Sequence, residues 1–310
     1  MEAGAYHRPV MLRETLELLV ANVAGVYVDG TLGGGGHAEA ILERLSGRGS
    51  LIGIDRDSDA LQAAGTRLAR FGSQARIVKG NFSKMGELLA QVGIEKVSGV
   101  LLDLGVSSFQ LDEARKGFSF RLDAPLDMRM DRDQPLSAKE VVNTYETERL
   151  ANVLWTYGEE RNSRRIARMI EYARRNTAIE STHALAAIVD RAVGGKILIK
   201  SLARVFQAIR IEVNDELNHL KRGLAASVDA LAAGGRIVVI SYHSLEDRIV
   251  KEAFRNSSAT SERAAHRLLA DVKRVPSVKL FTRKPLESTD EEIEENPRAR
   301  SAKLRAAEKL

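Results

Sequence analysis

The stretch VYVDGTLGGGGHAEAI, residues 26–41, places four consecutive glycines between an apolar run and a helical pattern. Bare backbone after a strand and before a helix lets a ligand approach the amide groups closely, and a helix N-terminus favours negative charge. Gly33, Gly35 and Ala38 also fit the spacing G-x-G-x-x-G/A of dinucleotide-binding loops. The stretch therefore predicts a strand, a loop that binds a nucleoside-containing cofactor, and a helix.

Short apolar runs alternate with amphipathic patterns on both sides of this loop. The runs at 51–55, 76–79 and 97–105 are expected to be buried strands, each separated from the next by a helix. Continuous apolar strands between helices are typical of a parallel sheet that is covered on both faces. We predict an α/β fold with a doubly wound, mostly parallel, Rossmann-like sheet.

This pattern is interrupted in the middle of the chain. Apolar strands stop near residue 112, and a buried-strand run returns only at 236–241, after a long helical stretch. We therefore predict an all-helical domain at 112–205, inserted between the fourth and fifth strands of a core formed by 1–111 and 206–310.

The last part of the chain is mostly polar. We expect VKLFT (278–282) and SAKLRAAEK (301–309) to form a closing hairpin. The acidic segment PLESTDEEIEEN (285–296) between them is expected to be a surface loop.

Composition restricts the chemistry. The chain has no cysteine, which excludes disulfides, thiolate metal sites and thiol nucleophiles, and we expect no metal site. The net charge of +5 permits a polyanionic partner without establishing one. There is neither a secretory signal pattern nor an apolar run near the roughly 18 residues that span a bilayer, so we expect a cytoplasmic protein without membrane contact.

Two carboxylates at strand ends distinguish the candidate cofactors. Asp55 follows Gly33 by 22 residues and is placed to accept hydrogen bonds from the ribose of an adenine nucleoside. Asp29 lies just before the glycines, where it would repel a diphosphate but attract the ammonium group of S-adenosylmethionine. We therefore expect an S-adenosylmethionine-dependent methyltransferase, with an NAD(P)-dependent oxidoreductase as the alternative.

The sequence also bears on the methyl acceptor. Carbon methylation of cytosine requires a thiolate, so the absence of cysteine leaves a heteroatom acceptor. Asp103, in DLGV (103–106), occupies the position of the D/N-P-P-Y motif of amino methyltransferases, although only the aspartate matches. It could hold the cofactor, hold the acceptor amine, or simply end the strand.

A second dense segment, SYHSLEDRIVK (241–251), follows the fifth strand. Ser244 and Asp247 suggest a capping-box variant that starts a helix, which leaves His243 unexplained. His243 is therefore a candidate for proton handling or base contact, with a structural role as the alternative.

Many motifs in order resemble one known family. They include DGTLGGGGH, IDRD, NFS, LLDLGVSSFQLD, GFSF, PLDMRMD, TYGEER, FQAIRIEVNDEL, SYHSLEDR and NPRARSAKLR, and they cover nearly the whole chain. The sequence is similar to the MraW family of bacterial 16S ribosomal RNA cytosine-N4 methyltransferases. The resemblance implies S-adenosylmethionine, a Rossmann-like core with a helical insert, and a cytosine of the decoding centre in 16S rRNA of the small ribosomal subunit as acceptor.

The resemblance also implies particular contacts. By position, the family's cofactor contacts fall on Gly35, Gly36, His37, Asp55, Phe82, Asp103 and Gln110. Phe82 would pack on the adenine. One departure is KSLAR at 200–204, where many members have H-P-A-T-R and only Arg204 matches.

Arginines suggest where RNA binds. Residues 161–175 hold six arginines and one glutamate, with apolar residues spaced to face a core; an ordinary solvated helix face is the alternative. The candidates for RNA contact are Arg129, Arg161, Arg164, Arg165, Arg168, Arg298 and Arg300. Arg129, in PLDMRMD (125–131), is expected to line the crevice after the fourth strand. A non-catalytic RNA-binding module is a further alternative, and the sequence leaves the oligomeric state open, a homodimer included.

Overall fold

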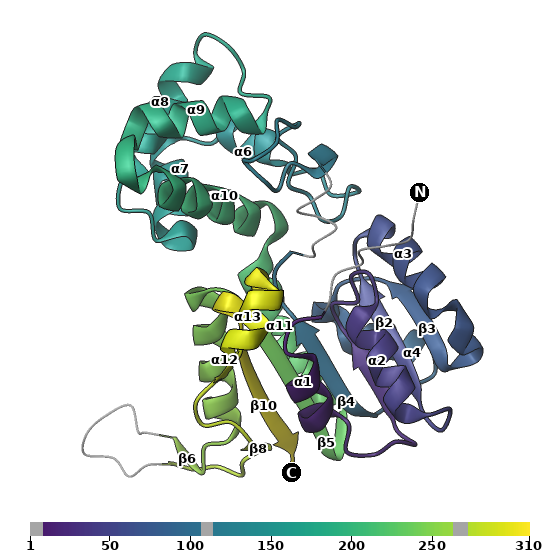
Figure 1. Ribbon diagram of the computed structural model, residues 1–310. Coiled ribbons are helices and arrows are strands. Elements are labelled where there is room, and N and C mark those ends of the chain that lie inside the picture. Colours follow the sequence, from purple (N-terminus) through teal and green to yellow (C-terminus); the bar gives the residue numbers. More distant parts are fainter. Residues whose placement is uncertain (1–8, 107–113, 263–271) are drawn as a thin grey trace. The chain divides into compact units, whose positions relative to one another are not determined.

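The computed structural model describes residues 9–106, 114–262 and 272–310, and the chain forms two compact units (Figure 1). One unit comprises Met1–Gly105 and Leu217–Leu310, and the other comprises Val106–Glu216. The helical unit thus extends beyond the predicted 112–205 at both ends. At its C-terminal end the reason is packing, because Phe206, Ile209 and Val213 are buried in the core of the helical unit.

The first unit is built on one mixed sheet. Its strands are β1 (Val26–Asp29), β2 (Ser50–Asp55), β3 (Ala75–Lys79), β4 (Val97–Asp103), β5 (Leu231–Ser241), β8 (Val278–Leu280), β9 (Leu286–Glu287) and β10 (Lys303–Lys309). The order is β3-β2-β1-β4-β5-β10-β8, with β9 paired to β10. Strands β1 to β5 are parallel, and β10 runs antiparallel to β5. This arrangement confirms the predicted doubly wound fold.

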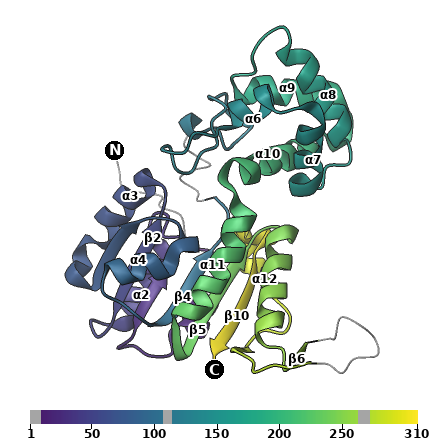
Figure 2. The same cartoon turned by 180° about the vertical axis from the view of Figure 1, so that it is seen from behind.

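Helices cover both faces of this sheet, as the two opposite views show (Figures 1 and 2). They are α1 (Leu12–Leu19), α2 (Gly36–Leu45), α3 (Ser58–Leu68), α4 (Met85–Gln91), α11 (Glu216–Ala230), α12 (Ser244–Ser257) and α13 (Asp290–Glu295), with 3-10 turns η1 (Ala69–Gln74), η2 (Phe82–Lys84) and η5 (Pro297–Ser301). Successive strand residues point to opposite faces. Leu101 and Val238 accordingly join one core cluster, whereas Leu102 and Val239 join another. Burial on both faces explains why the strands are continuously apolar.

The C-terminal segment confirms one prediction and corrects another. β8 and β10 pair antiparallel, as expected for the closing hairpin. The acidic segment 285–296, in contrast, is not simply a loop, because it contains β9 and α13. Thr289 caps α13 by accepting a hydrogen bond from the Glu292 amide, and three acids lie in the first turn, where the helix dipole favours them. A further two-stranded sheet pairs β6 (Ser261–Glu262) with β7 (Val272–Lys273).

The helical unit has its own core. It contains η3 (Ala114–Lys116), α6 (Ala138–Thr144), α7 (Thr147–Gly158), α8 (Ser163–Arg174), α9 (Thr182–Val193), η4 (Gly195–Ile197) and α10 (Leu198–Asn214). Ser137 and Glu140 form a capping box at the start of α6. Leu154, Ile166 and Val189 are fully buried in one cluster. Over the residues described in both units, the helices are too short or too polar to cross a membrane.

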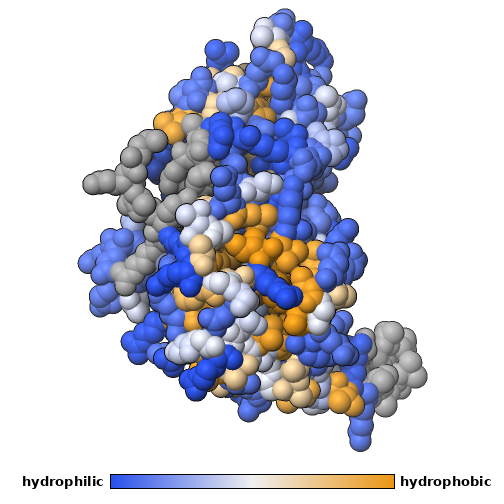
Figure 3. Space-filling view, turned by 90° about the vertical axis from the view of Figure 1, so that its right-hand side faces the viewer, coloured by the Kyte–Doolittle hydropathy of each residue, from blue (hydrophilic) through white to orange (hydrophobic). Residues whose placement is uncertain are grey.

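The sheet topology indicates the edge of the sheet at which a ligand is expected to bind. Strand order reverses between β1 and β4, and ligands of such sheets bind beyond the carboxyl ends of the strands at this point. Asp29, Asp55 and Asp103 are the last residues of β1, β2 and β4. Figure 3 views the molecule from the β3 side and shows hydrophobic residues gathered among hydrophilic ones on this unit.

Candidate active site

The glycine loop is held by the end of β2. Gly33 and Gly35 adopt positive φ angles of 50° and 80°, which favour glycine, and Gly36 is the first residue of α2. The Gly33 amide donates to Oδ2 of Asp55 at 2.8 Å, and the Asp57 amide donates to Oδ1 at 2.9 Å. Burial raises the pKa of Asp55, whereas these two amides oppose that shift. The loop and the predicted ribose-binding carboxylate therefore form one hydrogen-bonded unit.

Asp29 is a buried acid, with only 1% of its surface exposed. Burial raises its pKa to about 6, and the proximity of His37 partly offsets this. The backbone amide of Thr31 donates to Oδ1 of Asp29 at 3.1 Å, and the Thr31 hydroxyl accepts from the Asp103 amide at 2.6 Å. Thr31, which the sequence did not single out, thereby links the ends of β1 and β4.

Asp103 lies between two side chains that come from other elements. The Tyr242 hydroxyl donates to Oδ1 at 2.8 Å, and Nδ1 of His37 lies 3.5 Å from Oδ2. Burial raises the pKa of Asp103 to about 7, against the lowering effect of the Tyr242 hydrogen bond. Its side chain keeps 24% of its surface exposed, so a ligand can reach it.

His37 is fixed by the segment before α1. Its Nε2 lies 3.0 Å from the carbonyl oxygen of Val10. Because a carbonyl can only accept, Nε2 carries a hydrogen, and in the neutral ring Nδ1 is an acceptor. Burial lowers the pKa of His37, which favours that neutral form.

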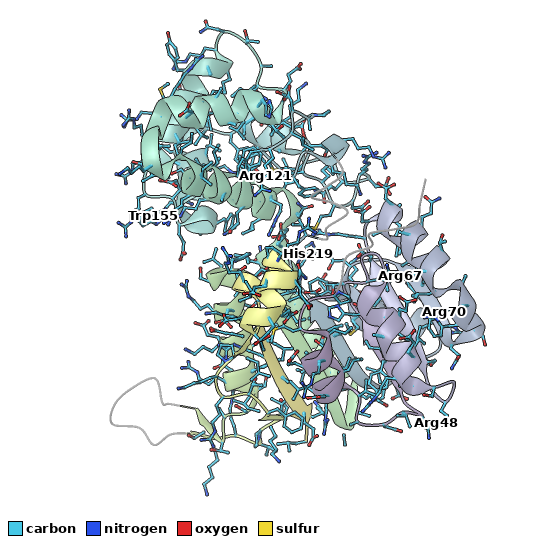
Figure 4. The ribbon with its side chains drawn as sticks, viewed as in Figure 1. Arg48, Arg67, Arg70, Arg121, Trp155 and His219 are labelled. Atoms are coloured by element: carbon cyan, nitrogen blue, oxygen red, sulfur yellow. The ribbon has the colours of Figure 1, made fainter. Side chains whose placement is uncertain are left out.

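The Phe82 ring packs against α11. A β-carbon at Gly223 would lie 2.2 Å from Cδ2 of the Phe82 ring, so the glycine leaves the space that the ring occupies. His219 is also on α11 and is labelled in Figure 4. The hydroxyl of Ser83, the residue after Phe82, lies 2.9 Å from Nδ1 of His219. Sequence reasoning missed His219 and Gly223, since a single histidine and a single glycine in a helix carry no distinguishing signal.

The structure corrects the interpretation of SYHSLEDRIVK. The N-cap of α12 is His243, not Ser244: Nδ1 of His243 accepts from the Glu246 amide at 3.4 Å, and the Glu246 carboxylate receives the His243 amide at 3.3 Å. Asp247 instead pairs with Arg305 at 2.7 Å. His243 therefore caps the start of α12 through Nδ1, while its neighbour Tyr242 is the residue that contacts Asp103.

The predicted RNA-contacting arginines lie in different settings. Arg161, Arg164, Arg165 and Arg168 are exposed, and Ile166 and Ile170 on the same helix are buried, as the spacing predicts. In the other unit, Arg298 is half-buried and Arg300 is exposed.

The guanidinium of Arg129 is engaged within its own loop. It pairs with both oxygens of Asp127 at 2.7 and 3.1 Å and donates to the carbonyls of Arg132 and Gln134. It lines a pocket of about 690 Å³ that lies within the helical unit. These contacts indicate that Arg129 stabilises the loop to which it belongs.

Two further predictions concern Gln110 and the departure at 200–204. Gln110 lies outside the described residues. Arg204 is on α10, with Nη1 3.9 Å from Oε2 of the buried Glu160. In the described part of the chain, no cluster of three or more histidines and acids is arranged to hold a metal ion.

Comparison with known proteins yields one consistent group. A family model described as the MraW methylase family matches residues 4–310. "Ribosomal RNA small subunit methyltransferase H" of Carboxydothermus hydrogenoformans is 50% identical over 306 residues, covering 98% of each chain. The protein of the same name from Geobacter sulfurreducens is 52% identical over 309 residues, covering 98% of this chain and 99% of its own.

The similarity of this chain to solved structures is weaker than its sequence similarity to these relatives. An rRNA methylase from Streptococcus thermophilus shares 11% identity, with a TM-score of 0.42 over 99% of each chain. A similarity at that level carries no information about the reaction.

Proposed function

The chain belongs to the MraW methylase family, and we propose that it transfers a methyl group from S-adenosylmethionine to the exocyclic N4 of a decoding-centre cytosine in 16S rRNA. Family membership and the names of its relatives support methyl transfer to ribosomal RNA, with S-adenosylmethionine as donor. The oxidoreductase alternative loses its support, because the family is one of methylases. The proposed substrate, in the small ribosomal subunit, implies action in the cytoplasm. A homodimer remains a prediction.

The observation that carries the proposal is the set of acids at the switch point of the sheet. Asp29, Asp55 and Asp103 end adjacent parallel strands, and burial raises the pKa of all three. A buried acid is stabilised in its charged form by a nearby cation or by hydrogen-bond donors. S-adenosylmethionine offers both, since it carries an ammonium group, a sulfonium and two ribose hydroxyls.

The residues fit this cofactor in distinct ways. Asp55 would accept from the ribose hydroxyls with the lone pairs that Gly33 and Asp57 leave free, and Asp29 would stabilise the ammonium group. Phe82 would lie against the adenine. Gly35, Gly36 and His37 would line the methionine portion at the start of α2, and Gln110 is retained as a contact on the family resemblance alone.

Asp103 would act on the acceptor amine. Methyl transfer leaves an extra proton on N4, and a positioned carboxylate with a pKa near neutrality is suited to take it. We therefore favour Asp103 over His243 for this role, because Nδ1 of His243 is engaged in the cap of α12. The exposed arginines Arg161, Arg164, Arg165 and Arg168 would bind RNA phosphates, with Arg298 and Arg300 assisting.

The proposal is tested by incubating the purified protein with methyl-labelled S-adenosylmethionine and either immature small subunits or naked 16S rRNA. After digestion to nucleosides, label should appear in N4-methylcytidine. Asp103→Asn serves as the control that keeps the shape of the site but lacks the base. Label in another nucleoside, or none with either substrate, would refute the assignment. Titration of the wild-type protein with NAD(P), followed by thermal shift, tests the oxidoreductase alternative.

A further inference from the structure

His37, Asp103 and Tyr242 form a connected group that no single sequence motif contains. They come from the start of α2, the end of β4 and the residue after β5. Tyr242 donates to one carboxylate oxygen of Asp103, and His37 faces the other. His37 is more deeply buried than Asp103, whose side chain retains an exposed edge.

The contacts give the two oxygens of Asp103 different chemistry. Oδ1 receives the Tyr242 hydrogen and so acts as an acceptor. Oδ2 faces Nδ1 of His37, which is itself an acceptor in the neutral ring because Nε2 donates to Val10. Two acceptors 3.5 Å apart are stabilised when a proton lies between them. A proton gained by Asp103 is therefore favoured at Oδ2.

We propose that Tyr242 is a positioning residue for methyl transfer, holding the Asp103 carboxylate by Oδ1 so that it meets the acceptor amine in its ionised form. The inference rests on the proposed function. During transfer the new N–C bond forms as the S–C bond breaks, and the sulfonium becomes a neutral thioether. The cationic N4 then passes its proton to the Asp103 carboxylate, which becomes a carboxylic acid.

Tyr242 suits this role because it remains a donor. Burial and the adjacent carboxylate of Asp103 raise its pKa well above the ordinary value, so the hydroxyl keeps its hydrogen at any working pH. The charged groups that act on this cluster are Asp29 on β1, Glu246 on α12 and Glu292 on α13. Glu246 also accepts from the Tyr242 amide at 2.9 Å, which fixes the backbone from which the ring projects.

The test is Tyr242→Phe, which removes the hydroxyl and keeps the ring. We expect kcat at pH 7 to fall about tenfold, as for the loss of one hydrogen bond to a charged group. Because the lost hydrogen bond stabilised the carboxylate, the pKa of Asp103 should rise, and the acidic limb of the kcat profile should move to higher pH. The KM for S-adenosylmethionine should change much less than kcat.

Tyr145→Phe is the matched control. Its hydroxyl donates to the Glu212 carboxylate at 2.8 Å in the helical unit, so the same kind of bond is lost elsewhere. Its pH profile should equal that of the wild type. If Tyr242→Phe does not fold, 3-fluorotyrosine at position 242 replaces it: a more acidic phenol is a stronger donor and should move the acidic limb to lower pH.

The outcomes separate the two proposals. If the wild type forms no N4-methylcytidine, the proposed function fails. If the wild type forms it and the Tyr242 variants keep the wild-type kcat and pH profile, only the positioning role is overturned. A raised KM with an unmoved profile would likewise overturn it, since that result indicates a purely structural contribution to the cofactor site.

Discussion

Phe82 and Gly223 are in direct contact: the ring lies where the side chain of any other residue at position 223 would begin. A β-carbon there would approach ring atoms Cδ2 and Cε2 to 2.2 and 2.4 Å. One turn earlier on the same helix, His219 contacts Ser83, the residue after Phe82. α11 therefore fixes the position of η2 by a packed ring and a hydrogen bond.

This contact predicts a defect for Gly223→Ala. The added methyl group must displace the Phe82 ring, because its carbon would lie 2.2 Å from a ring atom. We expect the free energy of unfolding to fall by about 1–3 kcal/mol. If Phe82 also forms the adenine wall, S-adenosylmethionine should bind more weakly, as calorimetry would show.

Gly86→Ala is the matched control for that substitution. A β-carbon at Gly86 would have no neighbour within 4 Å, and the residue lies in α4. Alanine favours a helix over glycine by about 1 kcal/mol, so this variant should be as stable as the wild type or more stable. A Gly223→Ala protein that matched it in stability and cofactor affinity would contradict the packing argument.

Asp55→Ala should separate cofactor binding from RNA binding. The carboxylate holds the glycine loop through Gly33 and is the expected ribose contact. Loss of hydrogen bonds to a charged acceptor costs about 1.5–3 kcal/mol, which corresponds to a loss of roughly 10- to 100-fold in affinity. Calorimetry with S-adenosylmethionine and filter binding with rRNA would measure the two affinities. Equal losses in both would refute the ribose assignment.

The sequence could predict the strands and their terminal acids because those signals are local. An apolar run that ends in Asp29, Asp55 or Asp103 indicates both the strand and the end at which a ligand site is expected. Tyr242 could not be assigned, because its partner Asp103 is 139 positions away and only the pairing of β4 with β5 joins them. The capping box of α12 was predicted wrongly for another reason: two overlapping capping boxes fit the same segment, and side-chain geometry alone selects the one formed by His243 and Glu246.

Asp103→Asn should stabilise the cofactor-free protein at high pH. An unfolded aspartate titrates near pH 4, whereas burial raises the folded pKa of Asp103 to about 7. The folded chain thus holds a proton that the unfolded chain has lost. This contribution to stability is complete below about pH 4 and is lost as pH rises through 7. Asparagine avoids the buried charge, can accept from Tyr242 and can donate to Nδ1 of His37.

We therefore expect the melting temperature of Asp103→Asn to exceed that of the wild type by about 2–4 °C at pH 8, for a gain on the order of 1 kcal/mol. The difference in melting temperature should be smaller at pH 5, where Asp103 of the wild type is protonated and therefore uncharged, like asparagine. Differential scanning calorimetry at both values measures it. If the gain in melting temperature is independent of pH, or if the variant melts at a lower temperature than the wild type at pH 8, then burial does not destabilise the charged form of Asp103.

Arg164 and Arg168 are one helical turn apart on the exposed face of α8, so they offer the clearest test of the RNA surface. Each phosphate neutralised by a cation contributes about 0.7–0.9 to the slope of log affinity against log salt concentration. The double variant Arg164→Ala and Arg168→Ala should therefore weaken rRNA binding and reduce that slope by up to about 1.8, with S-adenosylmethionine affinity unchanged. Arg13→Ala, which removes an exposed arginine paired with Glu17 on α1, is the control and should alter neither quantity. A double variant with the wild-type salt slope would show that this face of α8 is only solvated.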